Sequence, residues 1–223
     1  MHADHWHEKW HKQDINFNQL TPNAFLTSHF KNLHLRENAA IFVPLCGKTI
    51  DISWLLSKRY RVVGSELSEI AVQQLFTELA LEPTTTDVRT DLGPIKLYGA
   101  TGLDIFVGDI LTLTAEQIGP INAIYDRAAL VALPETMRNT YTQHLMQITA
   151  KAPQFLITYQ YDQQRTKGPP FSIPEEEVLK HYQGHYHVKQ CATVEVQGGI
   201  KGHCPGMEIA WLLNQKVSTT AKN

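Results

Sequence analysis

The sequence predicts an α/β fold in which a mostly parallel sheet is covered by helices on both faces. Apolar strand patterns alternate with helical patterns from residue 39 onward. Within this alternation, an apolar run over residues 41–45 breaks at Pro44 and Gly47, and the second apolar run ends on Glu66. A strand, a helix and a second strand that ends on an acidic residue are typical of folds that hold a nucleoside-containing ligand.

The individual strands and helices are predicted from the period of the hydrophobic residues, from helix caps and from turn residues. Strands are predicted at residues 40–45, 61–66, 95–98, 103–108, 121–126, 154–161, 187–196 and 207–213. Helices are predicted at residues 5–12, 22–33, 50–59, 68–80, 114–118, 134–150 and 174–183. Thr21 and Pro22 form the expected cap and first turn of the second of these helices. The last two strands have no helix between them, so an antiparallel pair is expected there.

Bulk composition excludes several classes of protein. A length of 223 residues favours one domain with a substantial core. The net charge of −2 gives no basic surface for nucleic acid. Three widely spaced cysteines form no disulfide framework or zinc motif. No signal peptide and no apolar run of about 20 residues is present, so a cytoplasmic protein without membrane contact is expected. No pattern demands oligomers, and a monomer is expected.

The loops at the carboxyl ends of the strands predict a cofactor site. Residues 45–49, 66–68 and 108–112 are expected to converge, with 126–130 as a fourth loop. Glu66 is placed to accept hydrogen bonds from both ribose hydroxyls, and Gly47 allows close approach of the backbone. The chain has neither a Gly-x-Gly-x-x-Gly loop nor a Gly-x-x-x-x-Gly-Lys-[Ser/Thr] loop for phosphates. A nucleoside cofactor without phosphates indicates S-adenosylmethionine.

Five motifs in order resemble the thiopurine S-methyltransferase family, and in particular its bacterial members. They are the aromatic leader with Trp6, Trp10 and Phe17, then residues 44–48, 63–69, 125–130 and 158–174. The resemblance implies a Rossmann-like class I methyltransferase fold with a seven-stranded sheet and an antiparallel last strand pair. It also implies an N-terminal helical cover over residues 1–35, a core over residues 36–223, and methyl transfer from S-adenosylmethionine to thiol-like acceptors.

The resemblance further implies roles for individual residues. Trp10 helps to cover the cofactor and Phe17 lines the acceptor pocket. Arg127 lies between cofactor and acceptor. The remaining cofactor contacts are Leu45 and Gly47 at the methionine half, Glu66 at the ribose, and Leu67, Asp109 and Ile110 at the adenine. Mammalian members have Ser at the position of Asp109, and residues 191–206, the far wall of the acceptor pocket, match the family poorly.

Simpler interpretations stand beside these roles. Cys46 has no fixed His partner and is better explained as a packed small residue than as a nucleophile. Trp10 is explained equally well by core packing and by a lid. Asp126 is explained equally well by a simple charge pair with Arg127 and by a part in chemistry. His7 and His11 have the spacing of zinc ligands, but a solvated helix face is favoured because no third ligand is implied.

Methyl transfer of this kind needs alignment and exclusion of water, and no catalytic triad or metal is expected. The acceptor is expected to be a small thiol such as a thiopurine, or a selenium or tellurium compound in detoxification. Two rivals remain at this point. A nicotinamide-dependent oxidoreductase needs a glycine-rich phosphate loop, for which residues 44–47 are a poor substitute. A sensor or resistance protein that only binds S-adenosylmethionine would not need residues that line an acceptor pocket, such as Phe17 and Arg127.

Overall fold

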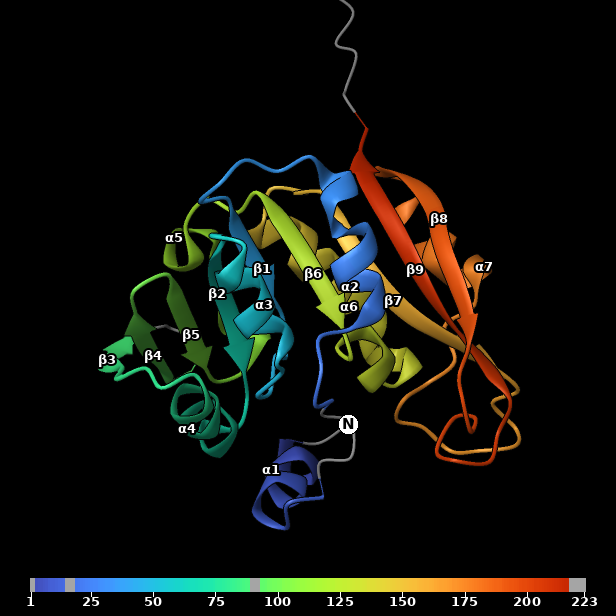
Figure 1. Cartoon of the computed structure of the whole chain (residues 1–223), viewed down its shortest axis with the longest axis horizontal. Coiled ribbons are helices and arrows are strands. Elements are labelled where there is room, and N and C mark those ends of the chain that lie inside the picture. Colours follow the sequence, from blue (N-terminus) through green and yellow to red (C-terminus); the bar gives the residue numbers. More distant parts are fainter. Residues whose placement is uncertain (1–2, 15–18, 89–92, 217–223) are drawn as a thin grey trace, which may run out of the picture.

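The computed structural model describes residues 3–14, 19–88 and 93–216. They form a nine-stranded sheet between two helical layers (Figure 1). The strands are β1 (Ala40–Val43), β2 (Arg61–Glu66), β3 (Thr84–Val88), β4 (Ile95–Ala100), β5 (Leu103–Val107), β6 (Ala123–Arg127), β7 (Gln154–Tyr161), β8 (Tyr186–Glu195) and β9 (Gly206–Gln215). The α-helices are α1 (Ala3–His11), α2 (Ala24–His29), α3 (Asp51–Ser57), α4 (Glu69–Glu78), α5 (Ala115–Ile118), α6 (Glu135–Ile148) and α7 (Glu175–Tyr182). Short 3₁₀ helices are η1 (Phe30–Leu33), η2 (Ile110–Thr112) and η3 (Leu130–Ala132).

The sheet has the order β3-β4-β5-β2-β1-β6-β7-β9-β8. Strands β5, β2, β1, β6 and β7 run parallel, and their carboxyl ends therefore meet at one edge. The predicted antiparallel pair at the end of the chain is confirmed, since β9 pairs antiparallel with both β7 and β8. The arrowheads of β2, β5 and β6 point towards the side of the molecule on which α1 lies (Figure 1).

Two apolar clusters fill the space above and below the sheet. Phe30, Ile52 and Phe76 belong to the cluster under α2, η1, α3 and α4. Leu145, Val178 and Tyr182 belong to the cluster under α5, α6 and α7 on the other face. Because both faces are covered, the central strands contain continuous apolar runs, such as residues 40–43 of β1 and 155–157 of β7, as the sequence predicted. No helix within the described ranges combines the length and the apolar character needed to cross a bilayer.

The prediction of seven strands is wrong, because the described residues form nine. Strand β3 was not predicted at all: its residues, Thr84 to Val88, lie at the edge of the sheet and four of the five are exposed. Such a strand needs no apolar side chains, so it leaves no alternating pattern in the sequence. It pairs antiparallel with β4, which in turn pairs antiparallel with β5. This edge of the sheet is therefore antiparallel as well.

Capping side chains set the first residues of helices that begin near the carboxyl ends of the parallel strands. Ser68 caps α4, since its hydroxyl accepts a hydrogen bond from the Ala71 amide at 3.4 Å. The predicted cap of α2 at Thr21 is wrong, because the cap is Asn23. The Asn23 side-chain oxygen accepts hydrogen bonds from the amides of Phe25 and Leu26, at 2.9 Å and 3.3 Å. A buried Asn thus begins α2 beside the carboxyl ends of the strands.

Candidate functional site

Three loops at the carboxyl edge are joined by hydrogen bonds around Glu66. The Gly47 amide in the loop after β1 donates to Glu66 Oε2 at 2.7 Å. The Gly108 amide after β5 donates to the Glu66 carbonyl at 2.9 Å. The prediction that the loops at 45–49, 66–68 and 108–112 converge is therefore confirmed, with Glu66 at the point where they meet.

The Glu66 carboxylate is buried and held from both sides. Its second oxygen, Oε1, accepts a hydrogen bond from the Ser68 amide at 2.9 Å. Burial raises the pKa of Glu66, and the amides of Ser68, Gly47 and Leu67 act against that rise. A carboxylate has about four acceptor lone pairs, so Glu66 retains capacity to accept a further hydrogen bond. This arrangement fits a ligand that presents two neighbouring hydroxyl groups, as a ribose does.

Trp10 of α1 closes over the loop after β1. Its side chain is only 2% exposed. Gly47 has φ +53°, and a Cβ placed there would lie 3.1 Å from Trp10 Cζ2. The absence of a side chain at Gly47 thus allows an aromatic ring to pack on the backbone of this loop. The structure therefore places Trp10, Gly47 and Glu66 in one region, as expected of residues that hold a cofactor.

Gly47→Ala is expected to weaken S-adenosylmethionine binding about tenfold, because the methyl group displaces Trp10 from the loop. Gly119→Ala is the matched control. Gly119 also has a positive φ, +69°, but nothing lies within 4 Å of its Cβ position. Both variants therefore place a side chain at a φ that favours glycine. Calorimetric affinities that fall equally in the two variants would show that the Trp10 contact is irrelevant.

The other residues expected at the cofactor lie at the same edge. Leu45 and Leu67 are half-buried, and Leu45 has φ +46° in the turn before Gly47. Asp109 is exposed, and its carboxylate accepts a hydrogen bond from the Leu111 amide at 3.0 Å at the start of η2. Ile110 is buried beside it. Phe17, expected in the acceptor pocket, lies outside the described residues.

Arg127 ends β6 and is held in a buried cluster. Its side chain is 7% exposed, and Nη1 lies 3.5 Å from Asp51 Oδ2. The same Asp51 oxygen accepts a hydrogen bond from the Tyr125 hydroxyl at 2.8 Å. Arg127 Nε is buried and has no hydrogen-bond partner among the described residues. A buried donor without a partner is costly, so this Nε–H is a candidate contact for a bound acceptor.

Two further residues of this cluster, Asn23 and Glu208, connect it to β9. The Asn23 amide donates to Asp51 Oδ1 at 2.8 Å, and its Nδ2 donates to Glu208 Oε1 at 3.1 Å. The Tyr159 hydroxyl lies 3.4 Å from the same Glu208 oxygen. Burial raises the pKa of Glu208, while the charge of Arg127 opposes that shift.

Sequence reasoning missed Asn23, Asp51 and Glu208. A weak signal was available in the alternation of side chains along strands. Tyr125 and Arg127 are two residues apart on β6 and so share a face of the sheet. Tyr159 and Glu208 pair directly across β7 and β9, which also places them on one face. The register between strands, which brings these pairs together, is not visible in the sequence.

Asp126 faces the opposite side of the sheet from Arg127. Its carboxylate accepts hydrogen bonds from the Tyr141 hydroxyl at 2.7 Å and from the Leu130 amide at 3.1 Å. Its side chain is fully buried, and burial raises its pKa to about 6 against these two hydrogen bonds. The geometry favours the interpretation in which Asp126 shapes the turn after β6 and takes no part in chemistry.

The pKa of Asp126 predicts a pH-dependent stability. The unfolded value is 3.8 and the folded value about 6, so the folded state binds the proton more tightly. Stability that is present at pH 4 is therefore lost as the pH rises through 6, by about 2 kcal/mol between pH 4 and pH 8. Asp126→Asn should remove this contribution. Urea unfolding of both proteins at the two pH values measures it, and a difference that is independent of pH would contradict it.

Two alternative site interpretations find little support. Cys46 is buried, and burial raises its pKa well above the usual value, which disfavours the thiolate a nucleophile needs. His7 and His11 are exposed on α1. Across the described ranges, no three His, Cys, Asp or Glu side chains are grouped so that they could hold a metal ion.

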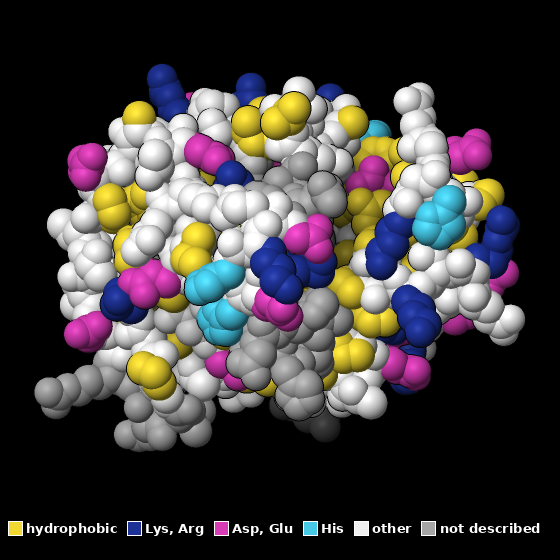
Figure 2. Space-filling model, turned by 90° about the horizontal axis from the view of Figure 1, so that it is seen from below, with side chains coloured by type: hydrophobic (Ala, Val, Ile, Leu, Met, Phe, Trp, Pro, Cys, Tyr) yellow, Lys and Arg dark blue, Asp and Glu magenta, His cyan; other side chains and the backbone are white. Residues whose placement is uncertain are grey.

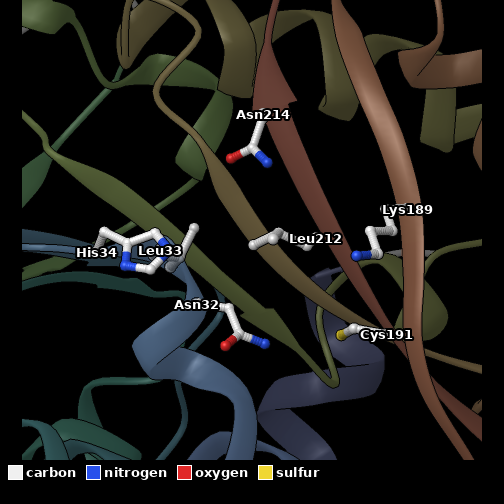
Figure 3. A pocket seen from close by; sticks show the side chains of 7 residues that line it. All are labelled: Asn32, Leu33, His34, Lys189, Cys191, Leu212 and Asn214. Atoms are coloured by element: carbon white, nitrogen blue, oxygen red, sulfur yellow. The ribbon is translucent and has the colours of Figure 1, made fainter.

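The surface carries charges of both signs and a hollow. On the face seen in Figure 2, Lys and Arg side chains are interspersed with Asp and Glu side chains. A hollow of about 410 Å³ lies between η1 and the β8–β9 pair, and Figure 3 shows its lining side chains. These are Asn32, Leu33, His34, Lys189, Cys191, Leu212 and Asn214. None of the residues expected at the cofactor lines this hollow, and of the stretch 191–206 expected at the acceptor only its first residue, Cys191, does.

Comparison with protein families gives a match over most of the chain. The family model described as Thiopurine S-methyltransferase (TPMT) matches residues 1–209. Two bacterial relatives bear the name thiopurine S-methyltransferase. The protein from Xanthobacter autotrophicus is 47% identical over 216 residues, covering 96% of this chain and all of that protein. The protein from Teredinibacter turnerae is 45% identical over 219 residues, covering 98% of this chain and all of that protein.

Solved structures share the architecture at low sequence identity. Burkholderia thailandensis 1,6-didemethyltoxoflavin-N1-methyltransferase, crystallised with bound 1,6-didemethyltoxoflavin and S-adenosylhomocysteine, superposes with a TM-score of 0.61 at 13% identity, over 95% of this chain and 87% of that one. The N-methyltransferase NodS from Bradyrhizobium japonicum, also with S-adenosylhomocysteine, gives 0.62 at 12% identity, over 93% and 97%. At such identities the likeness concerns the fold.

Proposed function

The chain belongs to the thiopurine S-methyltransferase family, and from this premise we propose that it transfers a methyl group from S-adenosylmethionine to a small thiol. The observation that carries the proposal is the pairing of two sites at one sheet edge. Glu66 and Gly47 form a ribose-type cradle on one side of β1, and Arg127 presents a buried Nε–H on the other.

The residues of the cradle fit S-adenosylmethionine. Glu66 is held by the amides of Gly47 and Ser68 and retains capacity to accept a hydrogen bond from a ribose hydroxyl. We assign the methionine half to the loop with Leu45 and Gly47, and the adenine to Leu67, Asp109 and Ile110. Trp10 and the cover over residues 1–35 exclude water from the bound pair, since Trp10 already packs on the loop.

The proposed mechanism relies on orientation. When bound, S-adenosylmethionine supplies a methyl group that its sulfonium charge has already activated. The acceptor sulfur reacts as the thiolate, so no side chain has to remove a proton during the transfer. Arg127 keeps its positive charge at all relevant pH values, and its planar group with several donors orients the acceptor anion. The methyl–sulfonium bond breaks as the new carbon–sulfur bond forms, which yields a thioether and S-adenosylhomocysteine.

The acceptor class follows from the buried surroundings of Arg127. Aromatic thiols combine an apolar ring with an anionic sulfur, and Phe17 and the apolar groups of residues 191–206 are proposed to complete their pocket. Thiopurines belong to this class. Selenols and reduced tellurium compounds share the chemistry of a soft anion, so a role in selenium or tellurium detoxification is part of the proposal.

A turnover assay tests the function. Purified protein is incubated with S-adenosylmethionine and 6-mercaptopurine, thiophenol, selenite or tellurite, and S-adenosylhomocysteine is measured. Formation of this product with either thiol supports the proposal. Cofactor binding without turnover of any acceptor would overturn it and would favour a protein that binds S-adenosylmethionine without catalysis.

A further inference from the structure

Glu208 is the residue of the Arg127 cluster for which the proposed mechanism has no role. It lies near the start of β9, opposite Tyr159 on β7. This places its carboxylate on the same face of the sheet as Tyr125 and Arg127, at the carboxyl edge. The electrostatic influence of Glu208 extends to both of those side chains. A carboxylate in this position contributes to the potential that a bound acceptor experiences.

The orientation of Glu208 is set by a buried amide. Asn23 is 3% exposed, and its Nδ2 donates to Glu208 Oε1 while its main-chain amide donates to Asp51. The Asn23 side-chain oxygen is engaged in capping α2. Both polar atoms of the Asn23 side chain therefore have a partner. Asn23 thus binds the carboxylates of two members of the Arg127 cluster, Asp51 and Glu208.

The charges of this cluster do not balance. Among its described members, Arg127 is positive, while Asp51 and Glu208 carry carboxylates. Asp51 is 1% exposed and forms the ion pair with Arg127 directly. The positive charge of Arg127 is therefore largely matched before any acceptor binds. An acceptor with a single anionic sulfur is tolerated, but a second negative charge meets Glu208 in a partly buried region where repulsion is weakly screened.

We propose that Glu208 is a specificity-determining residue that selects acceptors carrying no negative charge besides the reacting thiolate. The inference rests on the proposed function, in which the acceptor lies at Arg127. It assigns to the chain uncharged aromatic or heterocyclic thiols and selenols as substrates, and it disfavours thiols that also carry a carboxylate. Asn23 acts as a positioning residue, since it holds the Glu208 carboxylate in place.

The test compares acceptors that differ only in charge. The probes are 3- and 4-mercaptobenzoate, each paired with the corresponding mercaptobenzamide, which has nearly the same shape. For each pair, kcat/KM is measured and the ratio of acid to amide is formed. A loss of folded protein or of cofactor binding lowers both values and cancels in the ratio. The ratio therefore reports on the charge of the acceptor site alone.

Glu208→Gln keeps an oxygen acceptor for Asn23 and Tyr159 and removes the charge. We expect it to raise the acid-to-amide ratio about tenfold for at least one of the two pairs. Glu82→Gln is the control, since Glu82 is also an exposed glutamate, and it lies between α4 and β3, outside the residues assigned to the cofactor and the acceptor. Its ratio should stay at the wild-type value.

The outcomes separate the two proposals. An unchanged or lower ratio in Glu208→Gln, in a protein that methylates the amides, would overturn the specificity inference and leave the function intact. An equal rise in Glu82→Gln would also overturn it, because the effect would then reflect the net charge of the protein. Absence of turnover of every thiol by the wild type would overturn the proposed function, and the inference with it.

Discussion

Replacing Arg127 with alanine is expected to lower kcat/KM for a thiol acceptor about 100-fold, equivalent to about 2.7 kcal/mol of transition-state stabilisation. The guanidinium is buried against Asp51, and its Nε–H has no partner among the described residues. A charged donor held in place before the acceptor binds contributes most where water is excluded. Steady-state kinetics with thiophenol measure the loss.

Controls separate this catalytic loss from a loss of folding. Arg127→Ala removes the cation from an ion pair with a buried carboxylate, so some loss of stability is expected. Asp51 still accepts hydrogen bonds from Tyr125 and from the Asn23 amide, which keeps it partnered. S-adenosylmethionine affinity, measured on the same preparation, should stay within about threefold of wild type. An unaltered kcat/KM in a folded variant would remove Arg127 from the mechanism.

The second large effect is expected at the cofactor. Glu66→Ala should weaken S-adenosylmethionine binding by about 1–3 kcal/mol, or roughly 5- to 150-fold in Kd. The variant loses the proposed acceptor for the ribose hydroxyls and leaves the amides of Gly47 and Ser68 without their partner. Because burial raises the pKa of Glu66, wild-type affinity should also fall as the carboxylate is protonated at low pH. Isothermal titration calorimetry measures both effects.

Glu69→Ala provides the comparison for Glu66→Ala. Glu69 lies three residues further along the chain, at the start of α4, and its carboxylate binds Lys96 and the Tyr98 hydroxyl at the surface. Its removal should leave the cofactor Kd unchanged. If Glu66→Ala binds S-adenosylmethionine as tightly as Glu69→Ala, the ribose assignment is wrong.

The sequence predicted the elements whose side chains are buried. The central strands and their helices were found because burial on both faces demands continuous apolar runs, and their order along the chain then indicated the fold. The edge strand β3 was missed because four of its five residues are exposed and therefore do not have to be apolar. The cap at Asn23 was missed because Thr21 and Pro22 offered the usual signal of a helix start two residues earlier.

The candidate site shows the same division. Glu66 and Gly47 lie close together in a single strand–helix–strand unit, so local sequence was enough to find them. The partners of Arg127 come from positions 23, 51 and 208, which only the strand register and the start of α2 bring together. Each also has an ordinary local explanation: Asn23 and Asp51 begin helices, and Glu208 begins a strand. Long-range pairing of this kind cannot be read from one sequence.

Strand β1 lies between β2 and β6, and this position divides the carboxyl edge into two halves. Glu66 ends β2 and Asp109 follows β5 on one side, while Arg127, Tyr159 and Glu208 come from β6, β7 and β9 on the other. Under the proposed function, we expect substitutions in the second half to alter acceptor binding without disturbing donor binding. This separation makes the protein a suitable starting point for directed evolution towards new methyl acceptors, with mutagenesis confined to residues beyond β6.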